Sequence, residues 1–411
     1  MTTSMYNKKA GWPGSVQRFA FSQLSISFAV CNLTAKRSLT HKPDKIMTSR
    51  RTFLHTSALT SAAVSLSPNV LWSATRPAKD KLGVALVGLG YYSTDLLAPA
   101  LQKTKNCYLA GIVTGTPEKA EKWKKQYNIP DKNIYSYQTF DQVANNPDID
   151  VVYVVLPPSM HEEYVVRAAK AGKHVWVEKP MAVTTKECQN MIDACKKNNV
   201  SLAVGYRLHH EPNTQEYVKG LRDGKIGKIL MVSCSAGYYD NRTTHWKQKK
   251  EMGGGVMYDM GVYVLQGARL ATGEEPIAVT AQQFTSRPDV YKNGLDETTM
   301  AQLIFPSGAR AAVQSSYGMN MNYLDVTGSK GTLRMEPYSG YNGDKGVWSA
   351  GGKIEHPYEV PWQQTKQMDD DAEAIMNKKP MLVPGEEGLR DIRIVEAIYA
   401  AAKSGKEVKI G

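Results

Sequence analysis

Cysteine is scarce in this sequence, with five among 411 residues. Cys31 lies near the N-terminus, and the other four have no zinc-ligand spacing, so we expect no metal site and interpret them as small apolar core residues. Hydrophobic residues make up 42% and charged residues 22% of the chain, which excludes a disordered, collagen-like or coiled-coil protein. The length predicts a globular protein of two or three domains.

Acidic residues are nearly missing from the first 78 positions, where ten Lys/Arg stand against Asp44 alone. The remaining residues include 41 basic and 38 acidic ones, so the net charge of +12 belongs mostly to the N-terminal segment. A nucleic-acid-binding surface would carry its Lys/Arg on the folded body. We therefore expect no nucleic-acid partner, and the basic segment indicates a targeting leader.

Residues 1–78 are predicted to be this leader, with Met47 as an alternative start. The stretch SRRTFL at 49–54 is a twin-arginine pattern, an apolar run follows at 58–71, and Ala74 offers a cleavage point. A membrane anchor or a chance Arg-Arg pair are the alternatives, but the run is shorter than the ~20 residues that span a bilayer. We expect the twin-arginine machinery to export the folded protein to the periplasm.

From residue 79 onward, apolar strand-like runs alternate with helical periodicity, which predicts a parallel sheet covered on both faces. The fold class we expect is an α/β Rossmann domain over 79–204, followed over 205–411 by an α+β domain with a largely antiparallel open sheet. The strands expected in the first domain are 82–87, 108–113, 151–156, 174–177 and 201–204, and the helices are 95–103, 117–127, 161–171 and 186–198.

The second domain is predicted from β-rich runs separated by glycine and proline turns. An open sheet of this kind rarely stays bare, so we expect a homo-oligomer formed through its exposed face. The expected strands are 229–235, 277–284, 300–305, 309–317, 323–327 and 331–336, and a last amphipathic helix is expected over 389–404.

The first strand leads into a glycine turn, Gly88-x-Gly90-x-x-Ser93. Main-chain NH groups at such a turn and at the following helix N-terminus can bind a pyrophosphate. Ser93 replaces the usual third glycine and is still small enough for close helix–strand packing. A turn without a ligand is the alternative.

The end of the second strand, at Thr114-Gly115-Thr116, lacks the acidic residue that an NAD site places against the ribose hydroxyls. Thr114 and Thr116 can hydrogen-bond a 2′-phosphate, and Lys119 one turn later can neutralise it. NADP is therefore favoured over NAD as the cofactor. Lys119 could alternatively be an ordinary solvated charge on a basic helix.

Acid–base chemistry is suggested by two separated segments. Pro180 restricts Lys179 to an extended conformation at the carboxyl edge of the sheet. Asp259 and Tyr263 are four residues apart in a helical stretch and so share a face. Because a phenol normally has a pKa of about 10, it needs a nearby cation to act near neutral pH, and Lys179 could supply that cation.

These segments together resemble the Gfo/Idh/MocA oxidoreductases, over about 82–408. The resemblance implies that Tyr263 is the proton donor and acceptor, that Lys179 orients the substrate and stabilises the tyrosine anion, and that Asp259 positions a sugar. Tyrosine rather than histidine at 263 points to the glucose–fructose oxidoreductase branch. The motifs are Gly88-x-Gly90, Glu178-Lys179-Pro180, Gly205-Tyr206-Arg207, Gly254-Gly255 and Asp259-x-Gly261-x-Tyr263.

The same resemblance assigns further residues and packs the last helix against the first domain. His209 is expected as a wall of the substrate pocket or as a satisfied polar side chain. A metal at His209-His210-Glu211 is not expected because no third spaced ligand accompanies them. Lys247 stands where the family has arginine. The residues assigned to the cofactor are Tyr92, Thr114, Lys119, Tyr135, Leu156, Pro157, His161, Glu178, Arg207, Trp246 and Lys247.

The expected function accounts for both the export signal and the bound cofactor. NADP is scarce outside the cytoplasm, so an exported enzyme must carry its cofactor and regenerate it in place. We expect hydride transfer from an aldose, which becomes a lactone, to tightly held NADP and then to a second sugar such as fructose. The alternatives are an NAD(P)-dependent sugar dehydrogenase with exchangeable cofactor, an NAD-dependent glycosidase and a non-catalytic sugar-binding protein.

Overall fold

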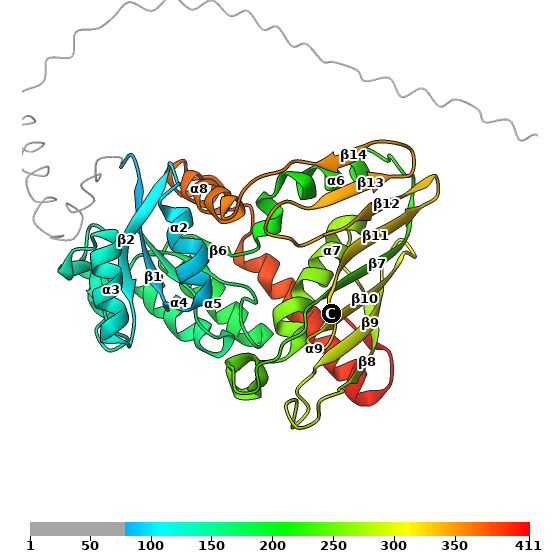
Figure 1. Cartoon of the computed structure of the whole chain (residues 1–411), viewed down its shortest axis with the longest axis horizontal. Helices are drawn as coiled ribbons and strands as arrows, with labels where there is room; N and C mark the ends of the chain where they lie inside the picture. Colours follow the sequence, from blue (N-terminus) through cyan, green and yellow to red (C-terminus); the bar gives the residue numbers. More distant parts are fainter. Residues whose placement is uncertain (1–78) are drawn as a thin grey trace, which may run out of the picture. The chain divides into compact units, whose positions relative to one another are not determined.

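The computed structural model describes residues 79–411, and these contain two β-sheets (Figure 1). The leader, its twin-arginine pattern and its cleavage point lie outside the described residues. Between residues 79 and 411, no helix is both long and apolar enough to cross a membrane.

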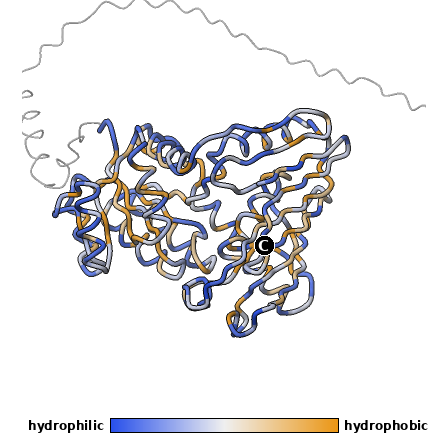
Figure 2. Tube along the Cα trace, viewed as in Figure 1, coloured by the Kyte–Doolittle hydropathy of each residue, from blue (hydrophilic) through white to orange (hydrophobic). Residues whose placement is uncertain are grey.

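The first sheet is parallel and has six strands in the order β3-β2-β1-β4-β5-β6. Its central strands are apolar without interruption because both faces are covered, and Figure 2 shows this concentration of hydrophobic residues. The strands are β1 (Leu82–Val87), β2 (Cys107–Val113), β3 (Ile134–Tyr135), β4 (Val151–Val154), β5 (His174–Val177) and β6 (Leu202–Val204).

Helices cover both faces of this sheet. Val165 and Cys188, from α4 and α5, pack on one face, and Leu97 and Trp123, from the segments after β1 and β2, pack on the other. A capping box between Thr184 and Glu187 begins α5. The helices are α2 (Ala98–Leu101), which continues a π-helical turn at Ser93–Leu97, α3 (Pro117–Tyr127), α4 (His161–Lys170) and α5 (Thr185–Lys197).

The second sheet has nine strands in the order β14-β13-β12-β11-β7-β10-β9-β8-β15, antiparallel except between β7 and β10. The expected fold class is confirmed. The strands are β7 (Ile229–Gly237), β8 (Ala278–Phe284), β9 (Thr298–Ile304), β10 (Arg310–Ser316), β11 (Met321–Gly328), β12 (Gly331–Met335), β13 (Lys345–Trp348), β14 (Lys353–Glu355) and β15 (Val408–Lys409).

One face of the second sheet is covered by α7, which contacts β7 and β10. Met231 on β7 and Met300 on β9 remain about half exposed. The other helices are α6 (Pro212–Arg222), α7 (Val262–Thr272), α8 (Trp362–Met376) and α9 (Gly385–Ser404), where α7 follows a π-helical turn at Met257–Gly261.

Two late helices return to the first sheet. Helix α9 contacts α5 and β6, and Met368 and Ala372 of α8 pack in the same core cluster as Leu86 and Trp176. Segments on both sides of residue 204 therefore share one core. The sequence patterns did not indicate α6 and α8 or the short strands β3, β13, β14 and β15.

The cysteines of the described chain are all buried and unpaired, as the core interpretation predicted. Burial raises the pKa of each thiol, so these groups remain protonated near neutral pH. The four are Cys107, Cys188, Cys195 and Cys234.

Candidate active site

The glycine turn after β1 forms one wall of a cavity. Gly88 has φ +91°, and a Cβ there would collide with the carbonyl oxygen of Val155. The Ser93 hydroxyl donates to the carbonyl oxygen of Gly88 at 2.6 Å and so braces the turn. A Cβ at Gly90 would meet no atom within 4 Å, so the backbone of the turn is open to a ligand.

The cavity beside this turn has a volume of about 560 Å³ and lies at the carboxyl edge of the first sheet. Its size, its glycine turn and its place at the carboxyl edge of the sheet fit a dinucleotide. It brings together most of the residues predicted to bind the cofactor: Gly88, Gly90, Tyr92, Thr114, Thr116, Lys119, Leu156, Pro157, Glu178, Lys179, Trp246 and Lys247.

The residues predicted to bind the 2′-phosphate of NADP lie around the glycine turn. The Lys119 ammonium donates to the Leu89 carbonyl oxygen at 3.1 Å, so the side chain reaches back from α3 to the glycine turn. The Thr114 hydroxyl accepts from the Thr116 backbone NH at 3.2 Å. A ribose phosphate at this end of the cavity would therefore face a cation and two hydroxyls, with no carboxylate in the cavity wall there.

A second cavity of about 360 Å³ adjoins the first. Tyr263 and Arg207 line the second cavity only. A ligand there would meet a nucleotide in the first cavity at a common wall. The residues common to both cavities are Tyr91, Lys179, Arg242, Lys247, Asp259 and Tyr341.

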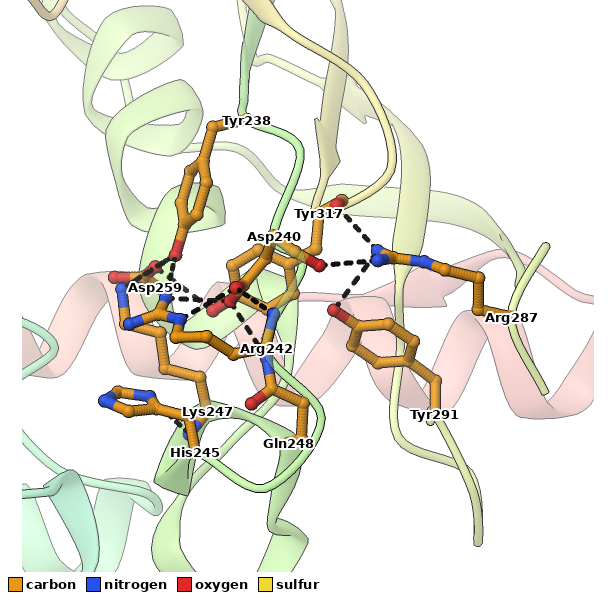
Figure 3. A network of polar contacts seen from close by, with 10 residues as sticks. All are labelled: Tyr238, Asp240, Arg242, His245, Lys247, Gln248, Asp259, Arg287, Tyr291 and Tyr317. Atoms are coloured by element: carbon orange, nitrogen blue, oxygen red, sulfur yellow. Dashed lines mark hydrogen bonds and ion pairs between the residues drawn. The ribbon is translucent and has the colours of Figure 1, made fainter. Parts of the chain in front are cut away.

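The Asp259 carboxylate is held between two lysines (Figure 3 shows the Lys247 side). Its Oδ1 accepts from Lys179 Nζ at 3.1 Å, and its Oδ2 accepts from Lys247 Nζ at 2.5 Å and from the Tyr317 hydroxyl at 3.1 Å. Burial alone would raise the pKa of Asp259, but the two lysines hold it well below its usual range. Asp259 is therefore an anion that fixes both ammonium groups.

Tyr263 lies under two cations. The Lys179 Nζ is 4.6 Å from the centre of the Tyr263 ring, and the Arg207 guanidinium is 5.3 Å from it. Burial lowers the pKa of Lys179, but its interactions with Tyr263 and Asp259 raise that pKa above the ordinary value. Lys179 is therefore charged near neutral pH beside the predicted proton-transfer group.

Arg207 was predicted to bind the cofactor, but its guanidinium is hydrogen-bonded to other groups of the protein. It is 2% exposed and donates to the carbonyl oxygens of Ser339 at 2.8 Å and Gly340 at 3.0 Å, and to the side chain of Gln363. Its guanidinium also stacks on Tyr341, at 4.3 Å. Arg207 thus holds the 339–341 loop at the edge of both cavities.

Three predicted residues do not line either cavity. The His161 Nε2 lies 2.7 Å from the Leu156 carbonyl oxygen, so His161 supports the cavity wall from behind. Tyr135 is buried and its hydroxyl accepts from Asn146 at 2.7 Å. His209 is half-buried, and its Nε2 lies 2.5 Å from Oε1 of Gln266.

Several residues of the cavity walls were not predicted from the sequence. Arg242 pairs with Asp240 at 2.7 Å and donates to the Tyr238 hydroxyl at 3.1 Å, which holds the loop after β7 against the cavities (Figure 3). These residues lie in loops that carry no periodic signal. The missed wall residues include Leu89, Tyr91, Tyr137, Pro158, Tyr238, Arg242, His245 and Tyr341.

Within residues 79–411, no group of three or more His, Cys, Asp or Glu is arranged to hold a metal ion.

Comparison with known proteins identifies the class of this fold and site. Residues 82–206 match the profile of the Gfo/Idh/MocA oxidoreductase family for its NAD-binding Rossmann fold, and residues 218–410 match the profile for its C-terminal alpha/beta domain. The chain belongs to the Gfo/Idh/MocA oxidoreductase family.

Individual relatives are similar over nearly their whole length. D-xylose 1-dehydrogenase [NADP(+)] from Haloarcula marismortui is 25% identical over 82% of this chain and 96% of its own length. The structure of aldose-aldose oxidoreductase from Caulobacter crescentus, complexed with glycerol, is 40% identical, with TM-score 0.77 over 80% of this chain and 99% of that one. Levoglucosan dehydrogenase, at 22% identity and TM-score 0.70 over 80% and 99% of the two chains, shares the fold.

Proposed function

We propose that this protein is an exported sugar oxidoreductase that moves hydride from an aldose to a second sugar through one tightly held NADP. The observation that carries the proposal is the common wall of the two cavities. Lys179 and Asp259 belong to both cavities, and Tyr263 lies beside them in the second cavity.

The chain's own residues would bind, orient and exchange a proton. NADP, when bound, supplies the hydride acceptor and donor. The Tyr263 hydroxyl would take the proton of the aldose C1 hydroxyl in the first half and return a proton to the second sugar's carbonyl oxygen in the other half. Lys179, fixed by Asp259 at 3.1 Å, would hold the reacting oxygen by hydrogen bonding.

Two relatives support the choice of substrates and cofactor. The Caulobacter protein is named for an aldose donor and an aldose acceptor, and the Haloarcula protein for NADP. The glucose–fructose oxidoreductase branch that Tyr263 favours would likewise use two sugars. The threonines and Lys119 around the glycine turn support NADP over NAD.

Export and self-association belong to the same proposal. The SRRTFL stretch supports passage by the twin-arginine machinery to the periplasm. Retaining the cofactor would let the enzyme work there without a soluble pool. The half-exposed Met231 and Met300 on the second sheet support a homo-oligomer formed through that face.

The test is a half-reaction on the full chain as purified. The released nucleotide is identified by mass, and the absorbance of reduced nicotinamide is followed as an aldose and then a second sugar are added. We expect NADP in the purified protein, a rise in absorbance with the aldose and a fall with the second sugar. Protein that arrives without nucleotide and turns over only with added NADP would instead be an ordinary sugar dehydrogenase.

The Tyr263→Phe variant tests the proton-transfer role, and Tyr258→Phe is its matched control. The Tyr258 hydroxyl donates to the Val183 carbonyl oxygen at 2.7 Å and lines neither cavity of the candidate site. We expect Tyr263→Phe to abolish both absorbance changes and Tyr258→Phe to retain them. Full turnover by Tyr263→Phe would exclude the proposed mechanism.

A further inference from the structure

Helix α8 turns three buried glutamines toward the cofactor cavity. Gln363, Gln364 and Gln367 are each no more than 1% exposed. Gln363 contacts Arg207, and Gln364 Nε2 donates to the Tyr92 hydroxyl at 3.4 Å. The Gln367 Nε2 donates to the Tyr153 hydroxyl at 3.0 Å. A helix from the second half of the chain therefore contacts the wall of a cavity formed mainly by the first half.

The Gln367 contact continues to Glu178. The Tyr153 hydroxyl donates to Oε1 of Glu178 at 2.5 Å, and both side chains are buried. An amide NH can only donate, so the tyrosine oxygen accepts from Gln367 and its own hydrogen is directed at Glu178. The three side chains form one directed chain of hydrogen bonds that ends on a carboxyl group lining the cofactor cavity.

We propose that Gln367 is a positioning residue that acts through Tyr153 on Glu178 and thereby couples the charge of Glu178 to the redox state of the nicotinamide cofactor. The inference rests on the proposed function only in requiring NADP in the first cavity. It does not depend on which sugars react.

The same three groups satisfy both charge states of Glu178. When Glu178 is an anion, hydrogen bonds run from Gln367 through Tyr153 to the carboxylate. When it is a neutral acid, it can donate to the Tyr153 oxygen. Tyr153 can then donate to the amide oxygen of Gln367 once the amide has rotated and exchanged the positions of Nε2 and Oε1. Within the described chain that Oε1 is buried and accepts no hydrogen bond, so it is free for this role.

The surroundings of Glu178 make both of its charge states accessible near neutral pH. Burial raises its pKa to about 7, against the lowering effects of the Tyr153 hydrogen bond and of Lys179 and Arg207. The ionisable groups that interact with it from the packed elements are Tyr153 of β4, Lys179 after β5, Arg207, Tyr92 and Tyr341.

The redox partner changes charge in the same cavity. An oxidised nicotinamide ring is cationic and a reduced ring is neutral, so an anionic Glu178 favours the oxidised form. By linkage, the oxidised cofactor lowers the pKa of Glu178 relative to the reduced cofactor. A difference of one pKa unit would correspond to about a tenfold change in the relative affinity for the two forms across the titration.

Infrared spectroscopy of the full chain tests this inference directly. The carbonyl band of a protonated carboxylic acid is followed against pH with the nucleotide in the first cavity as NADP⁺ or as NADPH, and subtraction of the Glu178→Gln spectrum isolates the Glu178 band. We expect a band that titrates near pH 7 and has its midpoint at lower pH with NADP⁺ than with NADPH. Equal midpoints with the two nucleotides, including the case in which neither binds, would overturn the coupling.

Two variants test the chain of contacts. Tyr153→Phe removes the donor to Glu178, and Gln367→Leu removes the donor to Tyr153. Both should move the midpoint to higher pH, with the larger move for Tyr153→Phe. Asp371→Asn is the matched control, because Asp371 is also buried on α8, one turn after Gln367, and its side-chain oxygens make no hydrogen bond within residues 79–411. It should leave the Glu178 midpoint unchanged.

The outcomes separate the inference from the proposed function. A Gln367→Leu protein that melts at the wild-type temperature and keeps the wild-type midpoint would overturn the role of Gln367. If Gln367→Leu does not fold, an unmoved midpoint in Tyr153→Phe would overturn the relay. A protein that shows the nucleotide-dependent midpoints but exchanges no hydride with any sugar would overturn the proposed function and leave this inference standing.

Discussion

The ammonium group of Lys247 lies 2.5 Å from the Oδ2 of Asp259, twelve residues further along the chain. The other carboxylate oxygen is taken by Lys179. The predicted role of Asp259 in positioning a sugar stays a prediction. In the described structure its oxygens accept from protein donors, and the carboxylate places two cations at the junction of the cavities.

Replacing Lys247 by Met should destabilise the protein by about 3 kcal/mol, because a buried carboxylate loses one partner. Lys247→Arg should retain most of the stability, since a cation remains. Lys249→Met, two residues away and exposed, is the control and should have little effect. Denaturant unfolding measures each value. A Lys247→Met protein as stable as the control would mean that the ion pair contributes nothing.

Asp259→Asn should change how stability depends on pH. The folded-state pKa of Asp259 lies well below its ordinary value of 3.8, so the carboxylate stabilises the fold above that value and loses this contribution as the pH falls further. The stability difference between wild type and Asp259→Asn should be constant near neutral pH and shrink below about pH 4. Unfolding curves across acidic pH measure it, and Asp289→Asn on the surface should show no such trend. A difference that grows on acidification would contradict the assigned pKa direction.

Lys119→Ala should weaken binding of NADP more than binding of NAD, by about tenfold in the ratio, because one charge-assisted contact to a phosphate is lost. Lys122→Ala, on the same helix but outside the cavity wall, is the matched control. Fluorescence titration with both nucleotides measures the ratio. An unchanged ratio in Lys119→Ala would mean that this lysine is only a surface charge.

Met300→Arg should dissociate the proposed oligomer, because it places a charge on the open face of the second sheet, where Met300 is 46% exposed. Leu382→Arg, at an exposed position of similar size outside the sheet, should leave the assembly intact. Light scattering after size-exclusion chromatography gives both masses. A wild-type monomer would show that the sheet does not mediate assembly.

The first sheet was predictable because local patterns determine it. Strands buried on both faces are apolar throughout, and helices such as α3 carry clear boundaries, with Pro117 at the start and Asn128 in a left-handed conformation at the end. Helix α8 was not predictable, because its buried face carries Gln363, Gln364 and Gln367 and so looks solvated. Each of these glutamines has a hydrogen-bond partner more than 150 residues away in the chain.

The candidate site was predictable to a similar degree. Motifs indicated Gly88, Lys179 and Asp259, and these residues line the cavities. Residue type alone could not show that His161 supports a wall from behind. Nor could it show that Tyr341, in a loop far along the chain, lies between the cavities. Such placements depend on tertiary contacts between distant segments.

The return of α8 to the first sheet limits how this protein can be recombined with its relatives. Met368 and Ala372 fill the same core cluster as Leu86 and Trp176. A chimera that exchanges only residues up to 204 would place a foreign surface against this helix. The packing between the helix and the first sheet would then no longer be complementary. To transfer cofactor preference between relatives, residues 362–376 must therefore be exchanged together with the N-terminal segment.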